Sequence, residues 1–293
     1  MASPSQLSST SSPMFDTLVV VGVGLIGGSV AAAAKTRHLA RRVVGLGRSA
    51  AKLRGAVDRG IVDEAFEDPA RIGEADLVVA CTPVDRIADD IRRLARVLPA
   101  DCLYTDAGSV KEPICRSLAD DPPASGVFVG GHPLAGSEKG GWEHSDAELF
   151  QGKLCVVTPT GREPSGAVAR TEEFWKGLGM LVRRMSPQDH DTALALTSHL
   201  PHLVASALAA QLTEEMRPFA ARGFRDTTRI AAGDPDLWTS IFSSNTEPLQ
   251  DHLKRLMATL SQFATALDRN DATSLRDLLT VGQTARQAID GGD

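Results

Sequence analysis

The sequence predicts an α/β domain built on a parallel sheet, followed by an all-helical domain. Three observations support this prediction. Short β-branched and apolar runs alternate with helical segments over the first half of the chain, which is typical of parallel sheets. The first of these runs ends in a glycine-rich turn that leads into a helix. From Gln188 onward the chain shows helical periodicity and no convincing strand.

The glycine-rich turn has the spacing G-x-G-x-x-G and lies between a strand, Thr17 to Val21, and a good helix former, Val30 to Lys35. Gly22 makes the turn, Gly24 lets the backbone approach a pyrophosphate, and Gly27 lets helix and strand pack closely. The helix N-terminus directs N–H groups and a positive dipole at the phosphates. A glycine turn without a ligand is the simpler alternative, but the flanking strand and helix favour a Rossmann-type site for NAD or NADP. The predicted cofactor contacts here are Gly22, Gly24, Leu25, Ile26 and Gly27.

The end of the second strand bears on the choice between NAD and NADP. Many dinucleotide folds place Asp or Glu there to bind both ribose hydroxyls, but this chain has Gly47 followed by Arg48 and Ser49. Gly47 leaves room for a 2′-phosphate and Arg48 can pair with it, which favours NADP. Alternatively, Arg48 is a solvated turn residue that stacks on the adenine, and NAD remains open.

Three further predicted strands end in small or polar residues. They run from Ala75 to Cys81, from Leu103 to Ala107 and from Val127 to Pro133, and a helix from Val84 to Val97 follows the first. Ligands of open α/β sheets bind beyond the carboxyl ends of the strands. We therefore expect Thr82, Ser109 and His132 to converge on one crevice, with Thr82 and Pro83 against the cofactor.

The remaining composition excludes several classes of protein. The 293 residues suffice for two domains, and 42% hydrophobic with 23% charged residues is an ordinary soluble balance. A net charge of -6 without a basic block argues against a nucleic-acid partner. No run approaches a membrane span, so we expect no membrane partner and a cytoplasmic location. The four cysteines, without a C-x-x-C, indicate reduced core residues and no metal site.

Two more strands, Leu154 to Thr158 and Met180 to Met185, precede the helical half, and Pro187 marks the boundary. Apolar stripes then predict long helices. Pro201 should kink or break the first of them between His199 and His202. These histidines are either packing residues or polar groups pointed at the crevice. The expected segments are a disordered, Ser-rich tail (residues 1–14), a Rossmann domain that binds NAD(P) (15–187), and a helical substrate and dimerisation domain (188–293).

Five motifs in order resemble the prephenate/arogenate dehydrogenase family of tyrosine biosynthesis. The motifs are Gly22 to Ser29, Thr105 to Lys111, His132 to Glu138, Ser198 to His202 and Gly223 to Ala231. The resemblance implies an NAD(P)-dependent oxidative decarboxylation. In that reaction hydride leaves ring carbon C4 for the nicotinamide, the hydroxyl proton goes to a base, and CO2 departs as the ring becomes aromatic.

The resemblance also implies roles for individual residues. His132 matches the family's catalytic base, and histidine suits a base that works near neutral pH. Ser109 matches a serine that hydrogen-bonds the same hydroxyl, and Arg229 matches the arginine that holds the ring carboxylate. His199, His202 and Trp238 match positions in the substrate pocket. The family dimerises through its helical half, which implies a homodimer here.

Two alternatives remain open at the level of sequence. A β-hydroxyacid-type dehydrogenase shares the two-part layout, but those enzymes typically use a lysine of the helical domain as base. A non-catalytic NAD(P)-binding sensor would keep the glycines and have no need of His132, Ser109 and Arg229 together. The sequence leaves the substrate open between prephenate and arogenate.

Overall fold

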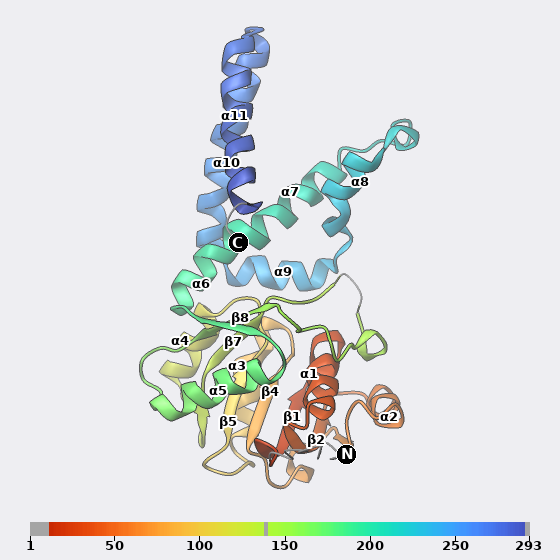
Figure 1. Ribbon diagram of the computed structural model, residues 1–293, viewed down its shortest axis with the longest axis vertical. Helices are drawn as coiled ribbons and strands as arrows, with labels where there is room; N and C mark the ends of the chain where they lie inside the picture. Colours follow the sequence, from red (N-terminus) through yellow and green to blue (C-terminus); the bar gives the residue numbers. More distant parts are fainter. Residues whose placement is uncertain (1–11, 138–139, 291–293) are drawn as a thin grey trace, which may run out of the picture.

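The computed structural model describes residues 12–137 and 140–290. An α/β body carries a helical part, from which two long helices project (Figure 1). The strands are β1 (Phe15–Val21), β2 (Ala40–Leu46), β3 (Glu64–Phe66), β4 (Leu77–Ala80), β5 (Leu103–Asp106), β6 (Val127–Phe128), β7 (Gly130–Pro133), β8 (Leu154–Thr158) and β9 (Leu181–Arg184). The predicted tail lies outside the described residues, apart from residues 12–14.

The helices alternate with strands in the α/β body and then follow one another without interruption by strands. They are α1 (Leu25–Thr36), α2 (Ala50–Asp58), α3 (Val84–Leu94), α4 (Glu112–Asp120), α5 (Ser165–Gly177), α6 (Pro187–Leu194), α7 (Leu200–Ala209), α8 (Arg222–Thr228), α9 (Pro235–Ser244), α10 (Thr246–Asp268) and α11 (Ala272–Asp290). Shorter turns are η1 (Pro69–Arg71), η2 (Trp142–His144), the π-helical η3 (Ala195–His199), η4 (Arg217–Phe219) and η5 (Arg229–Ala232).

The main sheet has the strand order β3-β2-β1-β4-β5-β6, and all its pairs are parallel. The order reverses direction between β1 and β4, which is the position where ligands of such sheets bind. The predicted Rossmann-type domain followed by an all-α domain is therefore confirmed.

The predicted fifth strand is wrong as a single strand, because the chain leaves the main sheet after Val129. Val127 and Phe128 pair with β5, whereas Gly130–Pro133 forms β7 in a second sheet of order β7-β8-β9. A Cβ on Gly130 would lie 2.4 Å from Thr158 Oγ1, and one on Gly131 would lie 2.9 Å from the Asp106 carbonyl oxygen. Two glycines therefore let β7 cross closely over the end of β5. His132 thus reaches the crevice from a strand of the second sheet and not from a strand of the main sheet.

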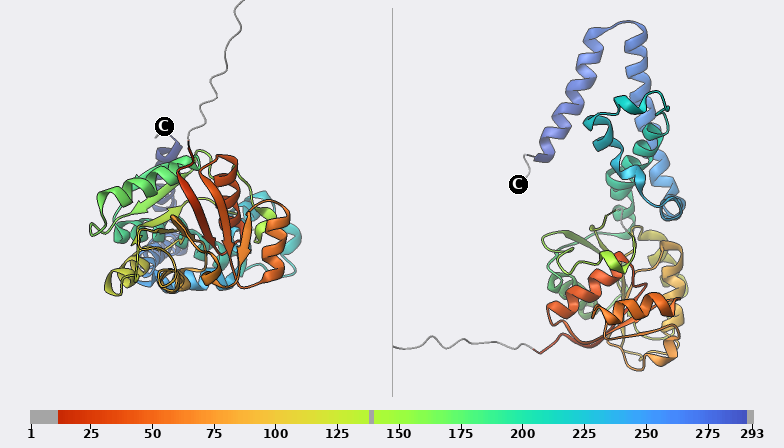
Figure 2. Two further views of the ribbon diagram at one scale, coloured as in Figure 1. Left: turned by 90° about the horizontal axis from the view of Figure 1, so that it is seen from below. Right: turned by 90° about the vertical axis from the view of Figure 1, so that its right-hand side faces the viewer.

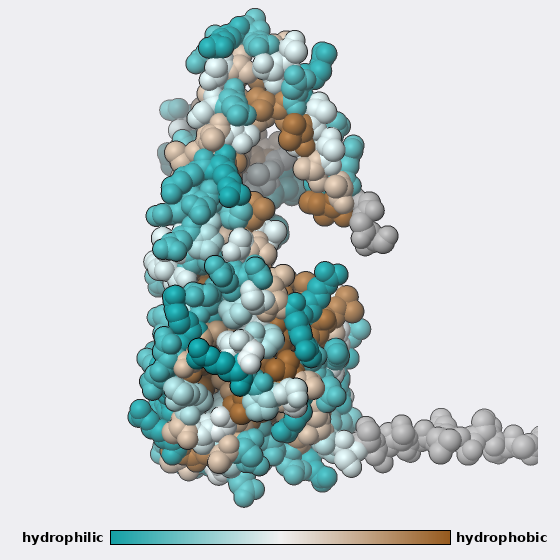
Figure 3. Space-filling view, turned by 90° about the vertical axis from the view of Figure 1, so that its left-hand side faces the viewer, coloured by the Kyte–Doolittle hydropathy of each residue, from teal (hydrophilic) through white to brown (hydrophobic). Residues whose placement is uncertain are grey.

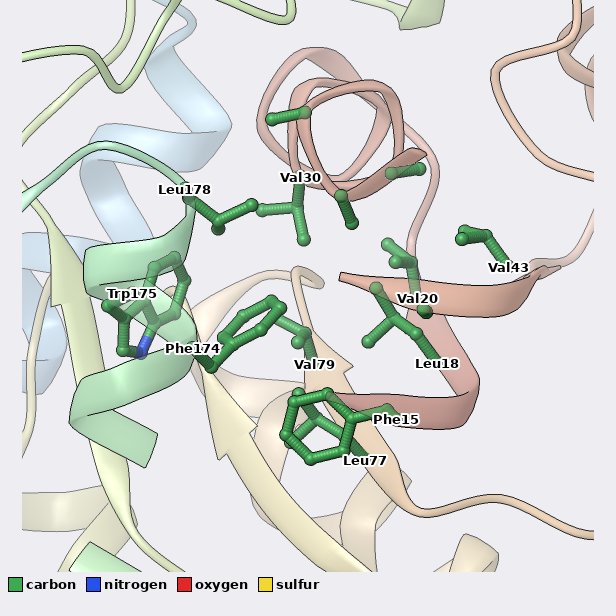
Figure 4. Packing of buried hydrophobic residues seen from close by; sticks show 14 of the residues in the cluster. Phe15, Leu18, Val20, Val30, Val43, Leu77, Val79, Phe174, Trp175 and Leu178 are labelled. Carbon is green, nitrogen blue, oxygen red and sulfur yellow. The ribbon is translucent and has the colours of Figure 1, made fainter. Parts of the chain in front are cut away.

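The core of the α/β body lies on both faces of the main sheet, because neighbouring residues of a strand point to opposite faces. Leu18 and Val20 of β1 pack with α1 and with Phe174 and Trp175 of α5, as Figure 4 shows. Val19 and Val21 join the other cluster, together with residues of α3 and α4. Buried on both faces, the strands read as continuous apolar runs in the sequence.

The helical part rests on this body through α9, which packs against α3. Ile241 of α9 belongs to the second core cluster, and Ser240 Oγ donates to Asp85 of α3 at 3.3 Å. Beyond it, α10 and α11 form a hairpin that projects away from the body (Figures 1 and 2). No described helix combines the length and apolar character needed to cross a membrane.

The break predicted at Pro201 does not occur. The helix instead widens into the π-helical turn η3, where the Leu200 N–H donates to the carbonyl of Ala195, five residues back. Pro201 then lies in the first turn of α7, directly after this π turn. The irregularity is therefore a π turn that ends at His199, and such turns occur often at functional sites.

Candidate active site

His132 lies on β7 at the junction of the α/β body and the helical part, with 9% of its surface exposed. Its Nδ1 is 2.8 Å from Nε2 of His190, and His190 Nδ1 is 2.7 Å from Oδ1 of Asp191. His190 and Asp191 are neighbours on α6, and both are buried. A carboxylate, an imidazole and the predicted base thus form one hydrogen-bonded chain.

A buried ion pair fixes the backbone beside His132. Lys111 Nζ donates to Asp106 and, at 3.0 Å, to the carbonyl of Gly131, while Gly131 N–H donates to Asp106 at 3.0 Å. Lys111 and Asp106 have no exposed side-chain surface. Each charge is compensated by the other and by hydrogen bonds, as buried charges require.

Burial keeps the histidines of this region in their neutral form. It lowers the pKa of His132 well below its usual value, and nearby His190, Lys111 and His199 lower it further. Burial also lowers the pKa of His190, against the opposing effect of Asp191. A neutral histidine can accept a proton, so His132 is suited to act as a base.

His199 ends the π turn and joins the same network through Asn245. The Asn245 amide nitrogen donates to the Asp191 carbonyl oxygen at 2.8 Å and lies 3.1 Å from His199 Nδ1. Because that nitrogen carries the hydrogens, His199 Nδ1 accepts and its Nε2 is protonated. This Nε2–H is buried and has no partner among the described residues.

His202 lies one turn further along, stacked on Trp238 of α9 with ring centroids 3.6 Å apart and planes 13° apart. Its Nδ1 is a second buried polar atom without a partner in the described part of the chain. Buried polar atoms are nearly always hydrogen-bonded in folded proteins. The two unpaired histidine atoms therefore indicate where a polar ligand can bind.

The glycine turn has the geometry that a dinucleotide requires. Gly22 has φ of +85°, and a Cβ on Gly27 would lie 2.2 Å from the Gly22 carbonyl oxygen. Gly24, the N-cap of α1, makes no side-chain cap, and a Cβ there would meet nothing within 4 Å. The first turn of α1, which begins with Leu25 and Ile26, has no acidic residue. These residues fit a pyrophosphate at the helix N-terminus.

The other predicted cofactor residues surround this turn. A Cβ on Gly22 would meet the Cys81 carbonyl and Thr82, which places the end of β4 directly beside the turn. Thr82 Oγ1 donates to Asp90 at 2.8 Å, and Pro83 is the N-cap of α3. Arg48 and Ser49 follow β2, with Arg48 exposed.

The structure brings His202, Trp238 and the turn η5 together. Ser109 lies on a different element. Ser109 is half-buried in the turn between β5 and α4, two residues before Lys111. Arg229 opens η5 and is exposed. A Cβ on Gly233, at the end of η5, would lie 2.6 Å from Trp238 Nε1 and 3.1 Å from His202. This contact places η5 beside the His202–Trp238 pair.

Sequence reasoning missed much of the buried network. The missed residues are Asp106, Lys111, His190, Asp191 and Asn245. Asp106 and Lys111 were visible as charges flanking the small-residue turn after a strand. His190 and Asp191 precede Leu194 by four and three residues, on the helix face that is buried. The described residues contain no cluster of ligands suited to a metal.

Together, a glycine turn on a Rossmann sheet and a neutral, buried histidine at the junction with a helical domain define a two-domain, dinucleotide-dependent dehydrogenase. Two family models match this chain: "Prephenate dehydrogenase, nucleotide-binding domain" over residues 30–183, and "Prephenate dehydrogenase, dimerization domain" over residues 186–281. The chain belongs to the prephenate dehydrogenase family.

Individual relatives agree with this assignment. The chain is 35% identical to cyclohexadienyl dehydrogenase of Zymomonas mobilis, covering 94% of this chain and 97% of that one. The structure of prephenate dehydrogenase from A. aeolicus with hydroxyphenyl propionate and NAD+ superimposes with a TM-score of 0.88 at 32% identity, covering 96% of this chain and all of that one. Synechocystis arogenate dehydrogenase gives 0.79 at 30% identity, with 93% and 99% covered.

Proposed function

We propose that this protein catalyses the NAD(P)-dependent oxidative decarboxylation of prephenate, or of arogenate, in tyrosine biosynthesis. The observation that carries the proposal is the neutral His132 at the junction, hydrogen-bonded through Nδ1 to His190. Its Nε2 is then the nitrogen that accepts the proton of the substrate's C4 hydroxyl. We assign Ser109 to the same hydroxyl, which it helps to align.

The glycine turn and Thr82 hold the dinucleotide in this proposal, because the turn combines close backbone approach with a helix N-terminus and Thr82 lies beside it. The bound nicotinamide supplies the hydride acceptor. The exposed Arg48 after Gly47 pairs with a 2′-phosphate, which favours NADP over NAD. We assign the dinucleotide, together with His132 and Ser109, to residues 15–187, and the remaining substrate contacts to residues 188–293.

The ring carboxylate is held by Arg229 in this proposal. A planar guanidinium can bind both carboxylate oxygens, and η5 lies beside His202 and Trp238, which line the ring side of the pocket together with His199. The carboxylate must leave as CO2, so a contact that orients it without a covalent bond is what the reaction requires.

We also propose a homodimer formed through the helical half. Large apolar side chains of α10 and α11 are exposed in the single chain, including Leu267 at 66%, Val281 at 71% and Ile289 at 74%. Apolar surface is visible where α10 and α11 face each other in Figure 3. A hollow of about 520 Å³ lies between these two helices. Such patches mark protein interfaces. A monomeric mass by light scattering at micromolar concentration would contradict the dimer.

The function is tested by following absorbance at 340 nm with each pairing of NAD or NADP with prephenate or arogenate. Reduction of at least one cofactor, with one CO2 released per hydride transferred, is the expected result. The preferred pair identifies the cofactor and the side chain, keto or amino, that the enzyme accepts. No reduction with any of the four pairs would refute the proposal.

A further inference from the structure

We propose that His190 and Asp191 are positioning residues that fix the tautomer and the ring orientation of the catalytic base, so that His132 keeps a lone pair on Nε2. This inference rests on the reaction proposed above. The geometry behind it is a chain of hydrogen bonds from Asp191 through His190 to His132, with every member buried.

The direction of each hydrogen bond follows from the Asp191 end. The backbone N–H of Lys111 donates to Asp191 Oδ1 at 2.7 Å, and that of Glu112 donates to Oδ2 at 2.8 Å. Both carboxylate oxygens are therefore acceptors, so His190 must donate its Nδ1–H to Oδ1. A neutral His190 then carries its lone pair on Nε2, where it can only accept. His132 donates Nδ1–H to it and is left with an unprotonated Nε2.

The chain of hydrogen bonds from Asp191 to His132 is anchored on both sides of the domain junction. The donors to Asp191 lie at the N-terminus of α4 in the α/β body, and Asn245 of the helical part donates to the Asp191 carbonyl oxygen. His132 is itself held through Gly131, whose N–H and carbonyl bind Asp106 and Lys111. The rings of His132 and His190 meet at 67°. Rotation of the His132 ring would break its buried hydrogen bond to His190.

The hydrogen bond from His132 to His190 can persist after proton transfer. Once His132 is protonated, its Nδ1–H donates to His190 as a charge-assisted bond, which is stronger than a neutral one. The titratable groups near His132 are His190 and Asp191 of α6, His199 of η3, Lys111 before α4 and Asp106 of β5.

Three variants of the full chain test the proposal. His190→Leu removes the acceptor, His190→Gln restores an oxygen near the position of Nε2, and Thr192→Ala changes an exposed neighbour on the same helix as a matched control. We expect His190→Leu to lower kcat about 10²-fold, the low end of the contribution of a general base. The Kd of the dinucleotide should stay within twofold. His190→Gln should recover about tenfold of that loss, and Thr192→Ala should behave as wild type.

Long-range 1H–15N NMR of the histidine side chains supplies a readout that does not depend on turnover. His132, assigned with His132→Asn, should be the Nδ1–H tautomer in the wild type and should lose that signature in His190→Leu. Wild-type kcat in His190→Leu, or an Nε2–H tautomer of His132 in the wild type, would overturn the proposal. If His190→Leu fails to fold, the tautomer of His132 in the wild type tests the proposal: Nδ1–H supports it and Nε2–H overturns it. An inactive wild type refutes the proposed reaction, and the tautomer still tests the positioning chain.

Discussion

The two halves of this protein differ in how much of their apolar surface a single chain buries. The α/β body covers both faces of its main sheet with helices, and β1 contributes fully buried residues to each face. The helical half exposes large apolar side chains along α10 and α11, such as Leu279 at 64% and Val281 at 71%. The α/β body is thus complete within one chain, whereas the helical half has the surface of a subunit interface.

This difference suggests a division of tasks. The complete half holds the glycine turn and His132, and in the proposed function the helical half supplies Arg229, His199 and His202 around the substrate. Changes on the helical side should therefore alter substrate binding and leave the Kd of the dinucleotide unchanged. Changes around β2 should alter the Kd of the dinucleotide and leave substrate binding unchanged.

The largest expected effect comes from Arg229 on the helical side. Arg229→Ala and Arg229→Lys should both raise KM for the substrate, because neither provides a planar fork for the ring carboxylate. The loss in kcat/KM should be about 2–5 kcal/mol, measured by steady-state kinetics. The Kd of the dinucleotide, measured by titration, should not change.

Arg222→Ala is the matched control, because this arginine opens α8, the helix directly before η5, and its side chain is 94% exposed. It should leave KM as in wild type. If Arg229→Ala weakens the dinucleotide and leaves KM intact, Arg229 belongs to the cofactor site and the division between the halves fails.

The opposite pattern is expected for Arg48 in the α/β body. If it pairs with the 2′-phosphate, Arg48→Ala should weaken NADP roughly tenfold to a hundredfold and NAD much less, with KM for the substrate unchanged. Arg41→Ala removes a surface arginine from β2, paired with Asp16, and should affect neither cofactor. Equal losses for NADP and NAD would show that Arg48 stacks on the adenine.

The sequence was sufficient for those features that depend on local pattern. The run Thr17 to Val21, the glycine spacing and the apolar stripes predicted the sheet, the turn and the helices, because a buried strand and an amphipathic helix have distinct periods. His132 was recognisable from its motif. These features depend on residues close together in the chain.

The sequence was insufficient where distant residues meet. Val127 to Pro133 reads as one strand, yet pairing with Tyr104 on one side and Val156 on the other divides it between two sheets. His190 and Asp191 read as polar residues of a helix start. Their role depends on Lys111 and Glu112, about eighty residues earlier, which only the folded chain brings to them.

A smaller expected effect is the contribution of His199, on the helical side, to the pH dependence of the free energy of unfolding. Burial lowers the pKa of His199 to about 4, so the folded state does not bind the proton that the unfolded state takes up below pH 6.5. The stability that neutral His199 contributes is present above that pH and is lost as pH falls from 6.5 toward 4. Between pH 7 and pH 5 this amounts to about 2 kcal/mol.

Urea unfolding at both pH values should therefore show a smaller loss for His199→Gln than for wild type, by about that amount. Thr192→Ala should keep the wild-type dependence on pH. The same loss in wild type and His199→Gln would mean that His199 does not contribute to the acid sensitivity of the fold.

The central claim is that His132, at the junction of the two halves, takes the hydroxyl proton and does not hold the dinucleotide. The most direct measurement is the turnover of His132→Asn at 340 nm, with the Kd of the dinucleotide measured alongside. Turnover should fall about 10²–10⁴-fold, the contribution of one general base, and the Kd should match wild type. Near-normal turnover of His132→Asn would contradict the claim, and the other buried histidines would then be the candidates for the base.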